Sequence, residues 1–178
     1  VTEEQARDIS GHRKVKAAGE RIVAGTISDG VFAKVPAEIS YMDSNNTKWS
    51  FIQLEEGREP EAVNEIIMDK AALDLLGVAP EIGAEISLTY QITDKNQNGG
   101  QKTDTLVLTG WWEYDSVCPV HFINVSRTYV ENLEKEMEKK GMEPFRTDLS
   151  VMLSSSLNID GTMDEIEKDL GYQVEDPD

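Results

Sequence analysis

Residues 54–88 have the sequence LEEGREPEAVNEIIMDKAALDLLGVAPEIGAEISL, and the order of the signals in this stretch decides the fold. A glycine- and proline-containing turn comes first, and the apolar run 64–68 after it predicts a short strand. Residues 71–76 then have the composition of a short helix, which we expect to end at Gly77 because glycine is favoured just after a helix. Gly83 marks the loop before another alternating apolar segment. The stretch therefore predicts turn, strand, helix and strand in that order.

The segment before this stretch predicts one helix and two strands. Thr2 and Gln5 have the spacing of a capping box and predict a helix that ends near Ser10. Residues 14–27 are rich in strand-forming residues. The Asp29-Gly30 turn signal and the alternating run 33–41 predict the returning strand of a hairpin.

The middle of the chain is expected to consist mostly of strands. We expect residues 43–46 to form a polar turn, and Trp49 and Phe51 to follow it on a strand because they are two residues apart. Alternating apolar residues at 86–90 and 106–110 predict a long hairpin. Its connection, residues 93–103, is polar.

The last third predicts strand, helix, strand and helix. Residues 122–125 are a short apolar run, and Ser126 is placed to cap a helix over 127–140. Residues 149–153 alternate as a strand. A second capping box, formed by Thr162 and Glu165, starts the last expected helix, which ends at the stop residue Gly171. The element order predicts an α+β fold with two lobes, of which the middle one is inserted into the other.

Charge limits the partners of this chain. Its 178 residues include 17 basic and 34 acidic side chains, which gives a formal net charge of −17. Proteins that bind nucleic acid concentrate Lys and Arg, so this balance argues against nucleic acid as a partner. It also argues against anionic lipid head groups and favours cationic partners. Cys118 is the only cysteine, so no internal disulfide forms. No apolar run approaches the ~18–20 residues of a membrane span.

No motif predicts a metal site or a catalytic site. Residues 94–99 match the first half of a calcium loop, but Thr105 stands where the bidentate acid is required. Cys118, His12 and His121 are too few for a structural zinc site. They also lack a recognisable third group for Cys/His catalysis.

Four further side chains are candidates for contacts with a ligand or partner: Trp49, Arg58, Trp111 and Trp112. Adjacent tryptophans on a strand point to opposite faces, so one is expected in a core and the other against solvent, a second lobe or a partner. Arg58 lies near Asn64-Glu65 and is expected either to clamp the turn to the next strand or to contact a ligand. The sequence leaves open whether these four side chains pack inside the protein or contact a ligand or partner.

These motifs, in this order, resemble the extracytoplasmic domain of FtsX/MacB-type ABC transporter permeases of Gram-positive bacteria. The resemblance covers about residues 2–172, and its later part rests on LTGWWE at 108–113 and on the segments 158–160 and 169–172. Each motif is weak alone, and their order and spacing carry the resemblance. Its structural residues here are Gly57, Arg58, Pro60, Asn64, Glu65, Gly77 and Gly83. The chain departs from longer members because it lacks both membrane spans and most of the strand expected before Thr2.

The resemblance implies a porter-like α/β lobe formed by both chain ends, residues 1–42 and 120–178, with an inserted β-rich lobe at 43–119. It implies a noncatalytic domain on the extracytoplasmic face of the cell membrane, without a metal or cofactor of its own. ATP would be used by a separate nucleotide-binding domain or subunit on the cytoplasmic side. The implied partners are the protein's own transmembrane spans and a second permease copy, together with a peptide, lipid or extracellular protein ligand.

Two other classes of function remain open from the sequence. A secreted module that binds a peptide or glycan would carry its ligand on an exposed tryptophan. A hydrolase would gather His12 or His121 with a nucleophile or with two carboxylates.

Overall fold

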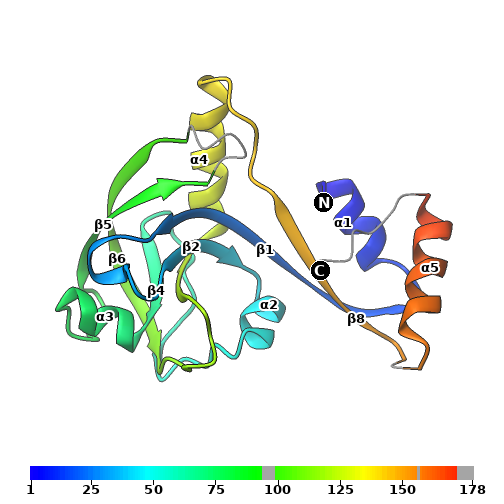
Figure 1. Ribbon diagram of the computed structural model, residues 1–178, viewed down its shortest axis with the longest axis horizontal. Coiled ribbons are helices and arrows are strands. Elements are labelled where there is room, and N and C mark those ends of the chain that lie inside the picture. The colour runs from blue at the N-terminus through cyan, green and yellow to red at the C-terminus, as the bar shows by residue number, and fades with distance from the viewer. Residues whose placement is uncertain (94–98, 156, 172–178) are drawn as a thin grey trace.

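The computed structural model describes residues 1–93, 99–155 and 157–171, and shows an α+β fold (Figure 1). Its helices are α1 (Glu3–Ser10), the 3₁₀ turn η1 (Gly30–Phe32), α2 (Ser44–Trp49), α3 (Lys70–Leu76), α4 (Arg127–Lys139) and α5 (Ile159–Leu170). Its strands are β1 (Val15–Ile27), β2 (Ala37–Met42), β3 (Glu56–Gly57), β4 (Glu65–Asp69), β5 (Glu85–Ile92), β6 (Gln101–Trp112), β7 (His121–Val125) and β8 (Thr147–Leu153).

The sheet closes on itself. Its strands follow the order β2-β7-β4-β6-β5-β1-β8, and an additional pairing joins β1 to β2. The strands from β2 to β1 therefore form a ring, and β8 lies outside it. Residues 15–20 of β1 pair only with β8, and Arg21 and Ile22 pair with both β8 and β2. The rest of the strand pairs with β2 and β5 inside the ring. β1 thus runs from the ring into a separate part of the molecule (Figure 1).

This path divides the molecule into two lobes. The sheet lobe, residues 21–146, contains the ring together with α2, α3 and α4. The end lobe, residues 1–20 and 147–171, contains α1, α5, β8 and the first part of β1 (Figure 1). Both strands that link the lobes, β1 and β8, cross the gap between them side by side.

Nearly all of the buried apolar side chains belong to the sheet lobe. Its main core cluster fills the ring and includes Leu73 of α3 and Val130 of α4. A second cluster, Met42, Ile52, Ile67 and Trp112, covers another face of the sheet. In the described part of the end lobe, the buried apolar side chains are Ile9 and Ile166. The lobes therefore differ strongly in the size of their cores.

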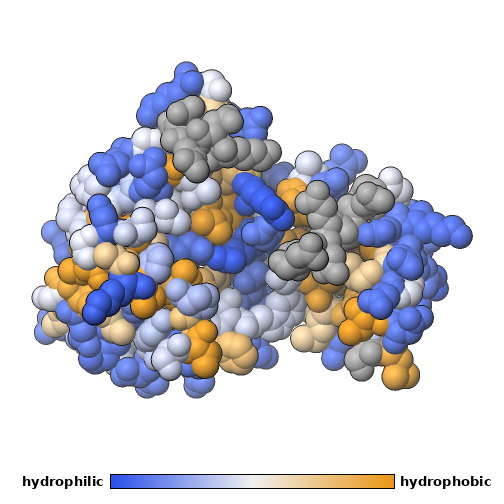
Figure 2. Space-filling model, viewed as in Figure 1, coloured by the Kyte–Doolittle hydropathy of each residue, from blue (hydrophilic) through white to orange (hydrophobic). Residues whose placement is uncertain are grey.

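The surface is hydrophilic over most of the visible face (Figure 2). An apolar patch lies at the outer end of the end lobe, where Leu157 and Ile159 are 81% and 53% exposed. No helix in the described part of the chain has the length and apolar character needed to cross a membrane.

The structure corrects two predicted elements. Residues 43–51 are not a turn and a strand: Asp43 caps α2, Trp49 is its last residue, and Phe51 has a φ of 58°. The side chain of Asp43 accepts a hydrogen bond from Asn46 N at 2.8 Å and so starts a helix. The last helix also begins earlier than predicted, because its N-cap is Asn158 rather than Thr162.

The predicted boundaries after residues 42 and 119 remain predictions. In the structure, β2 and β7 from the predicted outer segments share the closed ring with β4, β5 and β6 from the predicted insertion. The long hairpin is formed by β5 and β6, as expected. Residues 94–98 of its connection, which hold the calcium-like motif, lie outside the described residues.

Candidate functional site at the junction of the lobes

The glycine-arginine turn of residues 57–65 is held together by hydrogen bonds to one carboxylate within the sheet lobe. Nη1 and Nη2 of Arg58 donate to the Glu65 carboxylate, at 2.9 and 2.6 Å. The same carboxylate accepts from the backbone nitrogens of Glu61 and Ala62 at 2.9 and 3.0 Å. The Arg58 bonds, followed by these backbone bonds, lower the pKa of Glu65 to about 2. This geometry agrees with a turn clamp, and the role of Arg58 as a ligand contact remains a prediction.

Gly57 makes the close approach of this turn possible. It has a φ of 89° and pairs with Gly110 of β6. A Cβ on Gly57 would lie 2.0 Å from the carbonyl oxygen of Thr109, so no larger residue fits without movement of the backbone. The glycine that opens this turn is therefore required twice, for its backbone angle and for its contact with β6.

Trp111 and Trp112 point to opposite faces of β6, as a strand requires. Trp112 is only 5% exposed and belongs to the second core cluster. Trp111 is half-buried against the main core. The structure thus supports packing for Trp112, while a partner contact for either residue remains a prediction.

Trp49 lies at the place where the two lobes meet. A Cβ on Gly19 would be 2.9 Å from Cζ3 of the Trp49 ring, so the indole packs directly on the backbone of β1. In the same helix, the side chains of Asn45 and Asn46 donate to the carbonyl oxygens of Ala18 and Gly19, at 2.7 and 3.3 Å. Through this packing and these two hydrogen bonds, α2 of the sheet lobe contacts the part of β1 that enters the end lobe.

Glu20 receives further contacts from the sheet lobe. Its backbone N donates to the Asp43 carboxylate at 2.9 Å, and its carbonyl accepts from Asp43 N at 3.0 Å. Its carboxylate accepts from Arg127 at the start of α4. We call residues 18–20, together with the side chains that hold them, the junction.

Arg127 is the central charge of the junction. Its Nε donates to Glu131 at 3.1 Å, and its guanidinium lies 4.0 Å from the carboxylate of Glu3 in α1 and 5.5 Å from the centre of the Tyr41 ring. Burial lowers the pKa of Arg127, but hydrogen bonds to Glu20 and Tyr41 outweigh burial and raise the pKa above its ordinary value. Arg127 therefore stays charged and contacts both lobes.

A hollow of about 470 Å³ opens beside Arg127, between α1 and the sheet lobe. Glu3, Ala6 and Arg7 line it from the end lobe, and Asp43 and Arg127 line it from the sheet lobe. The lobes are therefore in contact around the junction and separated by open space next to it.

The two histidines of the rival catalytic hypotheses lie in different lobes, whereas Cys118 lies near His121: the Tyr114 hydroxyl donates to the Cys118 carbonyl, and the Tyr114 ring packs against His121. His12 lies in the end lobe, where its Nε2 is 3.1 Å from Asp169, while His121 lies buried in the sheet lobe with its Nδ1 3.0 Å from Asp69. Burial is the main cause that raises the pKa of the Cys118 thiol, and a reactive cysteine needs the opposite shift. Within residues 1–93, 99–155 and 157–171, no cluster of three metal-ligating side chains occurs.

Sequence reasoning singled out Trp49 as a contact residue but did not predict the rest of the junction. Glu20 and Arg127 are separated by 107 residues, and neither belongs to a motif. The only local signal was the run DSNN at 43–46, which suits a helix N-cap as well as a turn.

The comparison with solved structures bears on the fold. The extracellular domain of the noncanonic ABC-type transporter YknZ from Gram-positive bacteria superimposes with a TM-score of 0.58 at 14% identity, over 99% of this chain and 89% of that one. The chain has the fold of this extracellular transporter domain. The periplasmic region of MacB from Actinobacillus actinomycetemcomitans matches with a TM-score of 0.55 at 10% identity, over 96% of this chain and 74% of that one. No family model and no curated protein matches the sequence.

The shared fold agrees with the resemblance found from the sequence, which named the extracytoplasmic domain of MacB-type permeases. At 10–14% identity the likeness establishes the architecture alone. In this extracytoplasmic-domain fold, the junction is the contact through which the end lobe meets the closed sheet.

Proposed function

We propose that this chain is the noncatalytic extracytoplasmic domain of an ABC transporter permease, carried on the outer face of the cell membrane. In this proposal, ATP is hydrolysed by a separate nucleotide-binding domain or subunit. The domain passes movement of its own transmembrane spans to a substrate or partner outside the cell, next to a second permease copy.

The arrangement of α1 and α5 is the observation that carries the proposal. These helices come from opposite ends of the described chain and pack together in the end lobe (Figure 1). Salt bridges also join α5 to the segment between α1 and β1, where Arg13 and Lys14 both pair with Glu165. Two membrane spans that flank the domain would therefore both act on the end lobe. Because β1 and β8 leave this lobe together, any such movement reaches the sheet lobe through the junction.

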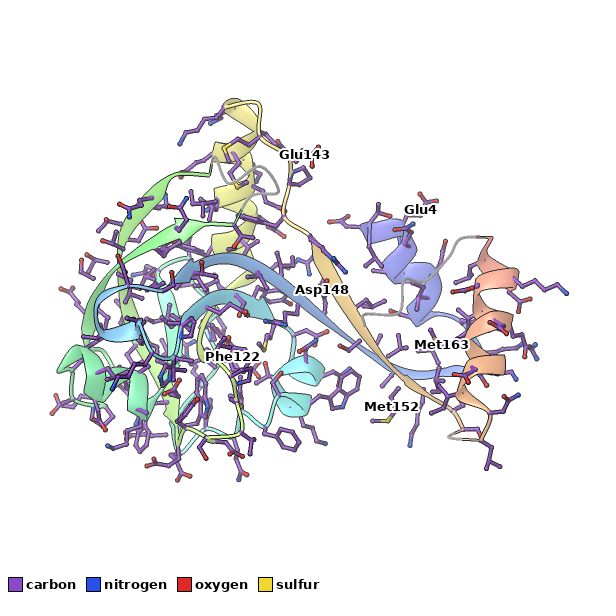
Figure 3. All side chains as sticks on the ribbon, in the orientation of Figure 1. Glu4, Phe122, Glu143, Asp148, Met152 and Met163 are labelled. Atoms are coloured by element: carbon purple, nitrogen blue, oxygen red, sulfur yellow. The ribbon has the colours of Figure 1, made fainter. Side chains whose placement is uncertain are left out.

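The surface of the end lobe supports the same orientation. Met152 on β8 is 41% exposed, and Figure 3 shows it on the strand facing away from α1. With Leu157 and Ile159 it gives the end lobe apolar side chains at its outer end. Such a surface suits a part of the domain that lies close to spans or lipid.

A first experiment tests the position of the domain in its parent protein. We expect the coding sequence on both sides of this chain to encode apolar segments of about 20 residues, the length of a membrane-spanning helix. A signal peptide upstream and a stop codon immediately downstream would contradict the proposal and favour a secreted binding module.

A second experiment tests transmission through the junction in the full transporter. Arg127→Gln removes the charge that links Glu20 and Glu3 and is expected to reduce the coupling between ATP hydrolysis and transport. Arg58→Gln is the matched control, because it makes the same substitution at an arginine whose carboxylate partner, Glu65, lies within the sheet lobe. Equal activities of both variants and the wild-type protein, at equal expression, would contradict transmission through Arg127.

A further inference from the structure

A second hollow, of about 380 Å³, lies on the sheet lobe at the carboxyl ends of β2 and β7. These neighbouring strands are parallel. Met42, Ile67 and Asn124 line the hollow from the sheet, and α2, residues 59–61 and the start of α4 surround it. Although this sheet is closed, the loops after β2 and β7 diverge here and leave a crevice, as they do at the ligand sites of open α/β sheets.

The side chain of Asn124 is buried in this region without a partner for its amino group. Asn124 is 2% exposed, and its Oδ1 accepts a weak hydrogen bond from Ser40 Oγ at 3.4 Å. Its Nδ2 has no hydrogen-bond partner among the described residues. Asn124 stands directly opposite Ile67 in the register of β4 and β7, so both side chains lie on the face that lines the hollow.

An unpaired buried N–H group requires an acceptor. Leaving such a donor unsatisfied costs more free energy than a hydrogen bond normally contributes, so native structures rarely keep one. Nδ2 of Asn124 is therefore suited to a carbonyl or carboxylate oxygen that enters from the hollow.

The charges at the rim of the hollow favour a carbonyl oxygen over a carboxylate oxygen as the acceptor. Glu59 and Glu61 line the hollow and are exposed. Neither forms a salt bridge with any of the described residues, although Glu59 accepts a hydrogen bond from Ser44 Oγ at 3.3 Å. Asp43 and Arg127 also line the hollow, and the charge of Arg127 is paired with Glu20. Arg58, which lies close by, is paired with Glu65. A free carboxylate would be repelled by this rim and by the net charge of −17. A neutral carbonyl is not repelled, and a cation beside it would be attracted to both glutamates.

We propose that this hollow binds an extended segment of a partner protein that carries lysine or arginine. A backbone carbonyl of the segment accepts from Asn124 Nδ2, and its cationic side chain lies between Glu59 and Glu61. A second copy of this chain does not fit, because two surfaces of the same strong negative charge repel each other. The inference does not depend on the transporter proposal, since it concerns the isolated domain.

The test is a titration of the isotope-labelled domain with hexalysine amide, followed by NMR. We expect shifts in the side-chain amide signals of Asn124 and in the backbone signals of residues 59–61. The double variant Glu59→Gln/Glu61→Gln should weaken binding about tenfold, because each lost charge pair at a surface contributes modestly. The matched control Glu4→Gln/Glu138→Gln has the same net charge and alters exposed acids on α1 and α4 (Glu4 is labelled in Figure 3). It should change the affinity by less than about twofold.

Two further measurements test the carbonyl contact. Spermine is a cation without a carbonyl group, and it should leave the Asn124 side-chain signals unmoved. Asn124→Leu removes the donor while keeping a similar volume, and it should weaken the binding of hexalysine amide.

Several results would overturn the proposal. One is equal weakening by both double variants, which would show attraction to net charge alone. Another is movement of the Asn124 signals by spermine as large as that by hexalysine amide. A third is wild-type affinity of a folded Asn124→Leu variant. If that variant fails to fold, the comparison of the two double variants still decides the outcome.

Discussion

The two lobes bury their side chains very differently. The sheet lobe closes its strands into a ring around a continuous apolar core, so both edges of that sheet are hydrogen-bonded. In the described end lobe, by contrast, Ile9 and Ile166 are the buried apolar side chains, and the pairing of β1 with β8 is supplemented by ion pairs of His12, Arg13 and Lys14 with α5. Apolar burial is the dominant stabilising contribution in folding, while exposed ion pairs contribute little. The sheet lobe should therefore have the higher stability and serve as a stable platform, while the end lobe should open and move more easily.

The largest expected effect is on the core of the sheet lobe. Trp112→Ala removes a side chain that is 5% exposed and packed against Ile67 and Met42. We expect it to lower the free energy of unfolding by about 3–5 kcal/mol, because the transfer and cavity contributions add. Chemical denaturation followed by circular dichroism measures this change. A loss below about 1 kcal/mol would show that the second cluster is not part of the stable platform.

The corresponding change in the end lobe should act locally. Ile166 is 1% exposed, and Ile166→Ala is expected to cost about 2–3 kcal/mol, near the lower end for this substitution, because few buried neighbours surround the site. Hydrogen exchange should accelerate in α1 and α5 while β4, β6 and β7 keep their protection. Equal acceleration in all these elements would contradict the division into two lobes.

A smaller effect is expected from the Arg58–Glu65 clamp, and it should depend on pH. The pKa of Glu65 in the folded protein is about 2, below the ordinary value of 4.5. The stability that the ionised carboxylate contributes is therefore fully present above about pH 4.5 and is lost as the pH falls towards 2. The difference in Tm between the wild-type protein and Glu65→Gln should shrink over this range.

That clamp belongs to the sheet lobe, so its loss should leave the end lobe unchanged. Hydrogen exchange of Glu65→Gln at neutral pH provides the control: exchange should change near residues 57–65 and not in α5. A Tm difference that stays constant between pH 5 and pH 2 would contradict an ionised Glu65 as the source of the effect.

The smallest effect concerns the ion pairs of the end lobe. Glu165→Gln removes the partner of Arg13 and Lys14 and should accelerate exchange in α5 by less than about threefold. The acceleration should disappear in about 0.5 M salt, which screens exposed pairs. Asp164→Asn serves as the matched control, because Asp164 forms no salt bridge among the described residues. An equal effect of both variants would mean that these pairs do not stabilise the lobe.

The sequence predicted most elements because their signals are local. The capping box of Thr2 and Gln5, the hairpin of β5 and β6 and the cap of α4 at Ser126 all appear in the structure. The prediction of a strand at Trp49 and Phe51 was wrong, because two aromatic residues at a spacing of two also fit the end of a short helix. The cap at Asp43 starts the helix, and the packing of Trp49 on Gly19, which the local pattern does not contain, holds its end against β1.

The closed ring and the junction could not be predicted either, because both depend on contacts between residues that are far apart in the sequence. Closure depends on the pairing of β1 with both β2 and β5, and a strand's own pattern does not name its neighbours. Glu20 and Arg127 lie on elements far apart in the chain, and neither charge stands out among 34 acidic and 17 basic residues. The unpaired amide of Asn124 likewise depends on what surrounds it in the folded protein.

Residue-resolved hydrogen exchange of the wild-type domain tests the central claim most directly. The account predicts that amides of α1 and α5 exchange through local opening, at a free energy clearly below that of amides in β4, β6 and β7. Exchange of both lobes at one common free energy would show a single cooperative unit, and it would contradict an end lobe that moves against a stable sheet.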